Sequence, residues 1–452
     1  MFSLSAVDGR YALKTAPIAK LFSEANLIKS RIIIEVGYLL ALAEHKLIRK
    51  ISVSEKKLLL KLCEPTLLQL KQLKKIENKT HHDVKAIEYF LRENIKTTSL
   101  KDLSPYLHFG LTSEDINNLA YRLMVQAGMQ QVLLPQLQLN LTQLNKISEK
   151  YCQQPMLART HGQRAIPTTF GKELAVFINR LLPLIKQLHQ FKLSGKLNGA
   201  VGGYQALQLS FPATNLIAFS KNFVEAFDFE FLPISTQINP NDDLVCLSQK
   251  LYHLNLILIG LNQDLWRYIS DDWLLQKHEQ GSIGSSTMPQ KINPIEFENS
   301  EGNLKMANGL LQIFIDNLPI SRLQRDLSDS TVMRNFGQAL AHCLLAYQSL
   351  EKGLAKISIN QSQLQQDLLA NWNILSEAAQ TLARKKGDDQ AYEKIALACK
   401  KKSLHKQDWL ALVQNIDSQL LTITPKNYLG LSVKLTKQTI KKSYQLIKEM
   451  QS

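Results

Sequence analysis

Apolar residues recur at every third or fourth position along the middle of the chain, and this spacing constrains the fold more than any other feature. It places them on one face of an α-helix, which turns once in about 3.6 residues. The longest stripe consists of Leu251, Leu254, Leu258, Leu261, Leu265 and Ile269. Shorter stripes are Leu137, Leu141 and Leu144; Phe177, Leu181, Ile185 and Leu188; and Phe336, Leu340, Cys343, Leu344 and Tyr347. We therefore predict an all-α protein with a central bundle of long helices.

Alternating patterns typical of β-strands are scarce. The best short-strand candidate runs from Phe229 to Ile238, and Pro233 weakens it because proline cannot donate a ladder hydrogen bond. The glycine-rich segment 194–206 is expected to interrupt the helices as a loop or a pair of tight turns.

The length of the chain indicates several domains, since 452 residues are too many for one small core. We place one boundary at residue 111, because Thr112 or Ser113 can cap a helix whose first turn holds Glu114 and Asp115. A second falls at 352, where the long stripes give way to shorter, more basic segments. The expected domains are an N-terminal helical domain (1–111), the central long-helix bundle (112–352) and a C-terminal helical domain (353–452).

Composition argues against several classes of protein. Hydrophobic residues make up 45% and charged residues 21%, as in ordinary globular proteins. No apolar run looks long enough to span a bilayer, and the N-terminus lacks the basic and apolar regions of a signal peptide. We expect a cytoplasmic protein with no membrane partner. Five scattered cysteines without a C-x-x-C pair predict reduced, mostly buried thiols rather than disulfides or a zinc site.

The net charge of +15 is spread along the chain, with its densest clusters at Lys385–Lys386 and Lys400–Lys402. This distribution favours a solvated basic face over a nucleic-acid partner. A weaker inference is that the positive field gathers a small polyanionic substrate.

Residues 281–294 read GSIGSSTMPQKINP. Glycines open backbone angles closed to other residues, and two prolines exclude a regular helix. Such a segment can fold over an anion with backbone N–H groups, hydroxyls and an ammonium, as a mobile catalytic loop does. A Gly/Ser cluster by itself is more often a plain connector, and the prediction of a catalytic loop rests on the family resemblance given below. The groups concerned are Gly281, Gly284, Ser285, Ser286 and Lys291.

Four further polar clusters lie where a helical bundle should be apolar. His161 stands in the cluster 159–163, which reads RTHGQ with what looks like a helix-opening glycine; a lone histidine is more often structural. In the cluster 79–83, His82 is either an imidazole oriented by Asp83 or the neighbour of a helix-capping aspartate.

The arginines of segment 321–334 either clamp a carboxylate or phosphate, or form a surface ladder of salt bridges. The N-terminal segment 8–11, DGRY, presents one guanidinium and one phenol in a turn.

Taken together in order, these segments resemble the fumarase/aspartase superfamily. The shared regions are THGQ (160–163) with Pro167 and Thr168, Gly195-Lys196 with Gly199–Gly202, and the loop GSSTMPQKINP. The strings DGRY, HDVKAIEYF, HFGLTSEDINN, TQINP and RDLSDSTVMRN narrow the resemblance to the adenylosuccinate lyase family, from Asp8 to about Asn335. Three positions depart from the family's common residues: Gln290 replaces histidine, Arg164 replaces proline and His81 replaces asparagine.

The resemblance implies a β-elimination that releases fumarate, from adenylosuccinate to give AMP and from the succinylcarboxamide intermediate of purine synthesis. By similarity Ser285 is the general base and His161 the general acid. Because a serine hydroxyl is a weak base, the loop must stabilise its alkoxide with N–H groups and Lys291. The residues implied around the substrate are Arg10, Tyr11, His81, His82, Asp83, Thr112, Ser113, Gln237, Ser286, Lys291, Ile292, Asn293, Asn299, Arg325, Ser330, Thr331, Val332, Met333 and Arg334.

The resemblance further implies a three-domain homotetramer whose central helices form one bundle and whose active sites are shared between subunits, with no metal or cofactor. Two other functional classes stay open as alternatives to an adenylosuccinate lyase. One is a sister lyase acting on argininosuccinate, aspartate, malate or a carboxymuconate. The other is a non-catalytic helical scaffold, against which the retention of both His161 and Ser285 argues.

Overall fold

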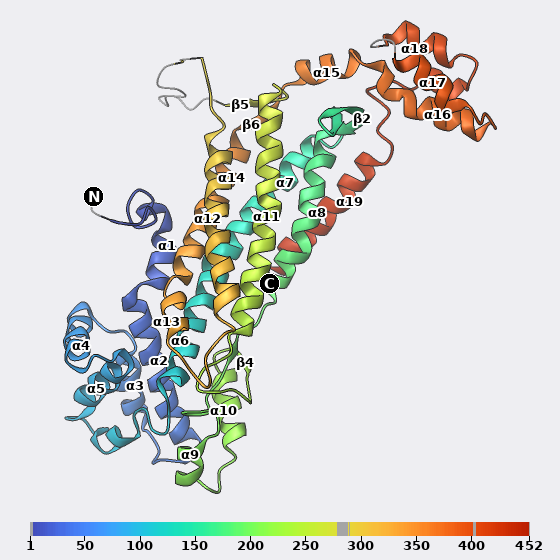
Figure 1. The fold of residues 1–452 in the computed structure, drawn as a ribbon. Coiled ribbons are helices and arrows are strands. Elements are labelled where there is room, and N and C mark those ends of the chain that lie inside the picture. The colour runs from blue at the N-terminus through green and yellow to red at the C-terminus, as the bar shows by residue number, and fades with distance from the viewer. Residues whose placement is uncertain (1–2, 278–287, 289, 401–403, 452) are drawn as a thin grey trace. The chain divides into compact units, whose positions relative to one another are not determined.

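The computed structural model describes residues 3–277, 288, 290–400 and 404–451 (Figure 1). The chain forms two compact units, each assembled from three segments. The first unit contains Met1–Pro135, Leu188–His253 and Lys305–Leu345, and the second contains Gln136–Gln187, Leu254–Leu304 and Ala346–Ser452. The three-domain division at residues 111 and 352 stays a prediction.

The first unit is built on two long helices, α2 (Glu24–Glu44) and α6 (Ser113–Gly128), which pack against each other. Ile32 and Leu39 of α2 and Leu119 of α6 are fully buried. Shorter elements surround them: α1 (Ala12–Phe22), α3 (Val53–Leu62), α4 (Leu67–Thr80), α5 (Asp83–Ile95), η1 (Lys101–Tyr106), η2 (Met129–Leu133), α9 (Gln205–Ser210), α10 (Leu216–Glu225) and α13 (Ser328–Met333).

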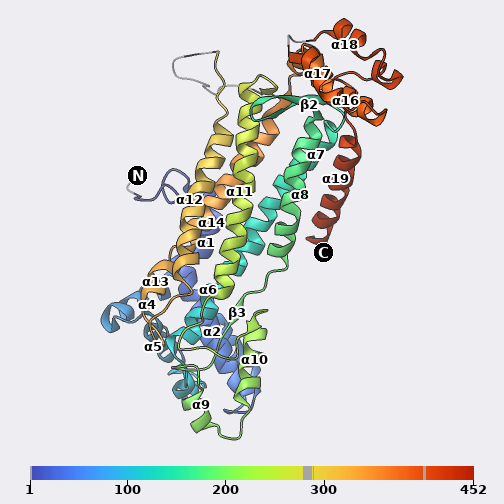
Figure 2. The same cartoon turned by 45° about the vertical axis from the view of Figure 1, so that its right-hand side comes forward.

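Five helices carry the predicted apolar stripes or run beside them: α7 (Leu134–Lys150), α8 (Phe170–His189), α11 (Asp242–Ser270), α12 (Ile295–Asn317) and α14 (Phe336–Lys356). Every stripe residue is buried except the partly exposed Ile269, which confirms the all-α prediction. Within the second unit these helices lie side by side (Figures 1 and 2). Polar pairs join them, from Tyr347 to Asn255 at 2.7 Å and from Asn262 to Ser300 at 2.9 Å.

Helix α11 corrects one expectation drawn from the sequence. Among the described residues it is the one helix that could cross a membrane by length and composition, with a mean hydropathy of 1.4 over its best window. Half of that window is buried inside the protein, and the helix carries Asn255 and Asn262, whose side chains are hydrogen-bonded to neighbouring helices. A core helix passes the same test, so this feature is weak evidence for a membrane span.

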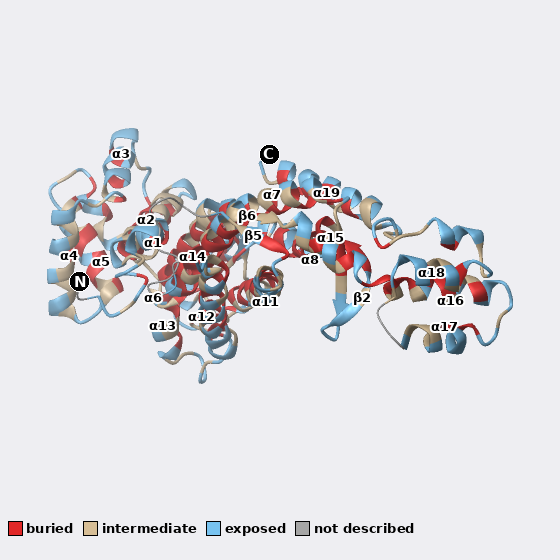
Figure 3. Ribbon diagram, turned by 90° about the horizontal axis from the view of Figure 1, so that it is seen from above, coloured by how far each residue is buried: buried red, intermediate tan, exposed pale blue. Residues whose placement is uncertain are grey.

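The end of the second unit contains short helices followed by one long one. They are α15 (Gln361–Leu369), η3 (Trp372–Leu375), α16 (Ser376–Lys385), α17 (Ala391–Lys400), α18 (Lys406–Val413), η4 (Ser418–Leu421) and α19 (Ser432–Glu449). The expectation of shorter segments beyond 352 therefore holds until α19. That helix buries one side, where Ser443 accepts a hydrogen bond from Asn145, and exposes the other (Figure 3).

Strands were predicted poorly. Of Phe229–Ile238 only β4 (Glu230–Phe231) is a strand, paired with β3 (Ser194–Gly195), because residues around Pro233 find no partner strand. A small antiparallel pair joins β5 (Leu274–Gln276) to β6 (Ile357–Ile359). A third pair was not predicted from the sequence: β1 (Pro155–Thr160) and β2 (Gln163–Thr169) form an antiparallel hairpin.

The tip of this hairpin is the two-residue loop His161-Gly162. Its φ angles of 52° and 71° are typical of the hairpin turn whose twist matches the strands. The sequence had suggested that Gly162 opens a helix. This prediction is wrong, because Gly162 lies in the turn of the hairpin.

The glycine-rich segment 194–206 is irregular beyond β3, as predicted. Gly202 has φ of 80°, and a Cβ there would lie 2.1 Å from the carbonyl oxygen of Ser235. Only glycine fits this position. The five cysteines are free; Cys63, Cys152 and Cys343 are buried, whereas Cys246 is exposed and Cys399 is partly exposed.

Candidate active site

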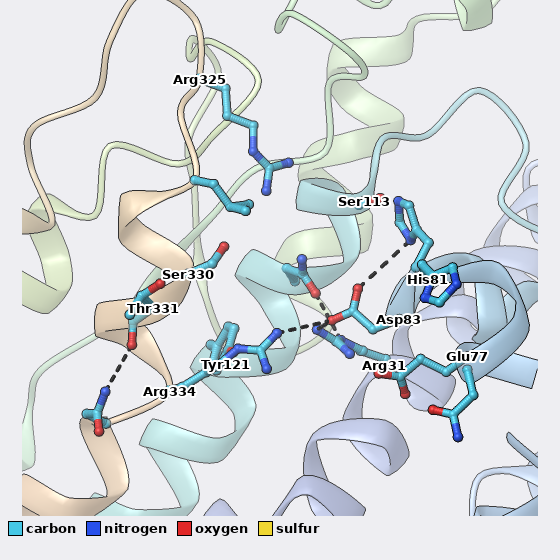
Figure 4. Close-up of a pocket in the computed structure, with 15 residues that line it drawn as sticks. Arg31, Glu77, His81, Asp83, Ser113, Tyr121, Arg325, Ser330, Thr331 and Arg334 are labelled. Atoms are coloured by element: carbon cyan, nitrogen blue, oxygen red, sulfur yellow. Dashed lines mark hydrogen bonds and ion pairs between the residues drawn. The ribbon is translucent and has the colours of Figure 1, made fainter. Parts of the chain in front are cut away.

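A cavity of about 810 Å³ opens in the first unit and is lined by residues of that unit alone (Figure 4). Three of its side chains are guanidinium groups, those of Arg31, Arg325 and Arg334. Many of the residues proposed from the sequence line it: His81, His82, Asp83, Ser113, Arg325, Ser330, Thr331 and Arg334.

The junction between α4 and α5 supplies one wall. His81 ends α4 in the left-handed conformation, with φ of 51°. His82 caps α5, because its Nδ1 accepts the backbone N–H of Lys85 at 3.1 Å. The N-cap of α5 is thus His82 rather than Asp83. The hydrogen bond from Lys85 N–H orients the imidazole, and Asp83 Oδ1 lies farther away, 3.9 Å from the same Nδ1.

Asp83 projects into the cavity between two arginines. Its Oδ2 accepts a hydrogen bond from Arg31 at 2.7 Å, and an Arg334 nitrogen lies 3.6 Å from the same oxygen. Burial opposes ionisation of this carboxyl, but the charge and hydrogen bond of Arg31, the backbone N–H of Val84 and the charge of Arg334 together lower its pKa below the ordinary value. The wall therefore carries a carboxylate at neutral pH.

The start of α6 supplies a second wall. Thr112 is the N-cap and donates its backbone N–H to Asp115 at 2.9 Å, so the helix begins where the sequence predicted. Ser113 lines the cavity and Thr112 does not. Asp115 is fully buried; it lies 2.9 Å from Lys196 Nζ and accepts N–H groups from Asn198 and Gly199. This carboxylate anchors the glycine-rich segment to α6.

Arg325 is held by partners on both sides. It donates to Gln237 at 3.0 Å and to Glu114 at 3.2 Å, and Gln237 donates in turn to the carbonyl oxygen of Ala200. Gln237 therefore orients Arg325 without lining the cavity. Arg322 has an 83% exposed side chain and pairs with Asp326, so segment 321–334 contains both a surface ion pair and residues of the cavity.

Helix α13 presents Ser330 and Thr331 to the cavity, and Arg334 follows the helix with a 61% exposed side chain (Figure 4). Of its neighbours, Val332 does not line the cavity, and the buried Met333 lines a smaller adjoining one of about 200 Å³. Burial and the charge of Glu114 raise the pKa of Asp329 above the ordinary value.

Other residues proposed from the sequence lie elsewhere. Arg10 and Tyr11 precede α1 and do not line the cavity. The second unit holds the exposed His161 at its hairpin tip, together with Lys291, Ile292, Asn293 and Asn299. Asn299 Oδ1 accepts a hydrogen bond from Ser349, and the carbonyl oxygen of Ile292 accepts one from Gln276. Ser285, Ser286 and most of the loop 281–294 lie outside the described residues.

Several lining residues were not predicted from the sequence, notably Arg31, Glu77, Asn117 and Tyr121. Two signals were available. Arg31 is a charged residue directly before the apolar run Ile32–Ile34. Asn117 lies within the motif HFGLTSEDINN, of which only Thr112 and Ser113 had been proposed as site residues.

Two protein-family profiles match the chain. The one described as Lyase covers residues 9–309, and the one described as Adenylosuccinate lyase C-terminal covers residues 321–429. The chain is 40% identical over 450 residues to the adenylosuccinate lyase of Haemophilus influenzae, across 96% of this chain and 98% of that one. It is 39% identical to the Escherichia coli adenylosuccinate lyase, across 95% and 97%.

Solved structures with a similar fold include a fumarate lyase from Mesorhizobium sp., with a TM-score of 0.79 at 17% identity over 94% of this chain and 97% of that one. A 3-carboxy-cis,cis-muconate lactonizing enzyme from Pseudomonas putida gives 0.78 at 18% identity, over 95% and 97%. At these identities the likeness concerns the fold alone.

Proposed function

The chain belongs to the adenylosuccinate lyase family, and from this premise we propose that it cleaves adenylosuccinate to AMP and fumarate. The observation that carries the proposal is the cavity of the first unit, where Arg325 and Arg334 lie with the hydroxyls of Ser330 and Ser113. Guanidinium and hydroxyl donors suit a phosphate group, and about 810 Å³ suits a nucleotide. We extend the proposal to the succinylcarboxamide intermediate of purine synthesis, which carries the same leaving fumarate on a ribonucleotide.

The elimination makes three chemical demands. A base must remove a proton beside a carboxylate, positive groups must stabilise the resulting dianion, and an acid must protonate the leaving nitrogen. We assign these roles to Ser285, Lys291 and His161. The support for His161 is its place at a hairpin tip, where its exposed imidazole is free to reach a ligand. The support for Ser285 is its position in the motif GSSTMPQKINP.

The remaining substrate contacts are assigned by family position. They include Arg10, Tyr11, Asn293 and Asn299, which do not line the cavity of the first unit. An assembly in which several subunits complete each site accounts for such residues. We therefore propose a cytoplasmic homotetramer with shared sites and no metal or cofactor.

Helix α12 offers support for assembly. Met306 and Ile313 have exposed fractions of 57% and 46%, and between them Gly309 has nothing within 4 Å of the position of a Cβ. Their spacing places all three on one face of the helix. An exposed apolar face with a glycine at its centre allows a second helix to approach closely.

A direct assay tests the proposed activity. We expect adenylosuccinate to lose absorbance on addition of the protein, with fumarate and AMP identified as products by mass spectrometry. A panel containing argininosuccinate, aspartate, malate and a carboxymuconate serves as the control. Release of fumarate from one of these instead of adenylosuccinate, or from none, would contradict the proposal.

Subunit mixing tests the shared site. His161→Ala and Ser285→Ala proteins, each inactive alone, should regain activity when their subunits exchange, because a hybrid can hold a site with both groups intact. Absence of recovery after exchange has been verified by mass spectrometry would contradict shared sites.

A further inference from the structure

Arg31 is a buried arginine in the wall of the cavity, and the family motifs leave it without a role. It lies on α2 with a side chain only 4% exposed. Its Nε donates to Asn117 Oδ1 at 2.9 Å, and one terminal nitrogen donates to Asp83 Oδ2 at 2.7 Å (Figure 4). A guanidinium fixed by two partners on α5 and α6 has little freedom to move.

Asn117 connects Arg31 to the far side of the cavity. Its Nδ2 donates to Glu114 Oε1 at 2.8 Å, and the same oxygen accepts from Arg325 at 3.2 Å. One hydrogen-bonded chain thus runs from Asp83 through Arg31, Asn117 and Glu114 to Arg325. Both ends of the chain line the cavity, and the middle is buried.

Arg334 differs from Arg31 although both lie beside Asp83. It is 61% exposed, and its nitrogen lies 3.6 Å from Asp83 Oδ2, beyond ordinary hydrogen-bond distance. Arg334 can therefore turn to a ligand at small cost. Once it does, Asp83 still needs a cation beside it, because its side chain is only 28% exposed and a partly buried carboxylate without a partner is destabilised.

We propose that Arg31 is a positioning residue for the nucleotide phosphate: it holds and neutralises Asp83 so that Arg334 can exchange this carboxylate for the phosphate of the ligand. The inference rests on the proposed function and adds to it. Arg31 does not contact the reacting atoms and sets affinity rather than turnover. Without it, Asp83 retains Arg334 and competes with the ligand.

This role predicts a distinctive pH dependence. Several charged and titratable groups surround Asp83. They are Arg31 on α2, Glu77 and His81 at the end of α4, His82 at the start of α5, Tyr121 on α6 and Arg334 after α13. In the wild type the pKa of Asp83 is low. Burial raises the pKa of Asp83 and Arg31 lowers it, so the pKa of Asp83 should be higher in a variant without Arg31. In that variant, protonation of Asp83 in acid should release Arg334 to the ligand.

The test measures AMP affinity by calorimetry and adenylosuccinate kinetics in Arg31→Met and Arg31→Lys. For Arg31→Met we expect the Kd for AMP and the KM to rise about ten- to a hundredfold near neutral pH, with kcat changed less than about threefold. The Kd ratio, which is the Kd of Arg31→Met divided by the wild-type Kd at the same pH, should fall as the pH decreases. Arg31→Lys keeps a cation beside Asp83, so its affinity should be nearer the wild type, without recovery in acid.

Arg122→Met is the matched control. Arg122 is equally buried on α6 and pairs with Asp243 and Asn241 away from the cavity. Both methionine variants should lower the melting temperature, but Arg122→Met should leave Kd and KM within about twofold of the wild type. Should Arg31→Met not fold, Arg31→Gln, which also removes the charge but keeps a hydrogen-bonding side chain, takes its place with the same expected rise in Kd and KM.

The results separate this inference from the proposed function. If wild-type protein releases no fumarate, the proposed function fails, and AMP binding still tests Arg31. If wild-type protein is active but Arg31→Met matches the Arg122→Met control in KM, Kd and pH dependence, the role of Arg31 is refuted. A Kd ratio that stays constant with pH would also refute it.

Discussion

The two units present their polar residues in opposite ways. In the first unit, Asp83, Arg31 and Arg325 lie in one network of buried or partly buried groups whose partners fix each side chain. In the second, His161 stands exposed at a hairpin tip and Lys291 is exposed. A rigid, charged cavity is suited to holding a nucleotide, whereas exposed groups on turns are suited to meeting a ligand and moving its protons. The comparison predicts that changes in the first unit alter affinity or stability and that changes in the second alter turnover.

The largest effects should come from the proposed acid and base. His161→Ala and Ser285→Ala should each lower kcat by about two to four orders of magnitude, because general acid and base steps contribute that much. Folding and assembly should persist, since His161 is exposed and makes the hairpin tip with Gly162. Steady-state kinetics with circular dichroism and light scattering check this. A variant that keeps near-wild-type kcat would remove its residue from the mechanism.

A large effect on stability, with a clear internal contrast, is expected inside the first unit. Asp115→Asn leaves the fully buried Lys196 without its counterion and should cost about 3–5 kcal/mol in the free energy of unfolding. Lys196→Met should cost less, because Asp115 would still accept N–H groups from Thr112, Asn198 and Gly199. Urea denaturation measures both. Equal costs would show that the backbone donors contribute little.

Lys291→Ala should give an intermediate loss of turnover. A preorganised ammonium stabilises developing negative charge by a few kcal/mol, so kcat should fall about ten- to a hundredfold while the melting temperature is unchanged. Lys291→Arg is the control that keeps the charge. If KM rises and kcat does not fall, Lys291 serves binding, and the contrast between the units is weakened.

The smallest effect concerns acid stability of the first unit. Asp83 has a lowered pKa in the folded protein, so it adds stability above its unfolded pKa of about 3.9, and this contribution is lost as the pH falls through the folded pKa. Asp83→Asn should therefore weaken the dependence of melting temperature on pH in that acidic range and leave it unaltered between pH 6 and 8. An unchanged acidic slope would indicate that Asp83 is not held as an ion.

The sequence predicted those features that repeat or that are local. The apolar stripes identified α7, α8, α11 and α14. A helix that buries one face carries apolar residues at every third or fourth position, and this spacing is visible in the sequence. The helix start at Thr112 or Ser113 was predicted from the neighbouring residues, and the structure has Thr112 as the N-cap. The hairpin at His161 was missed, since its turn depends on positive φ at a non-glycine residue, which the sequence does not reveal.

The candidate site was predictable only where motifs marked it. Ser330 and Arg334 were found from RDLSDSTVMRN, whereas Arg31 was not, because its partners Asp83 and Asn117 are distant in sequence and come together only in the fold. No single sequence shows such a pairing. Ser285 lies outside the described residues, and its role stays a prediction.

Calorimetric titration of the His161→Ala protein with adenylosuccinate tests the contrast between the units most directly, because slow turnover lets substrate binding be measured by itself. The account predicts a Kd within about threefold of the wild-type KM, alongside a kcat lower by about two to four orders of magnitude. Loss of substrate affinity in parallel with turnover would contradict it, and would place His161 among the groups that hold the substrate.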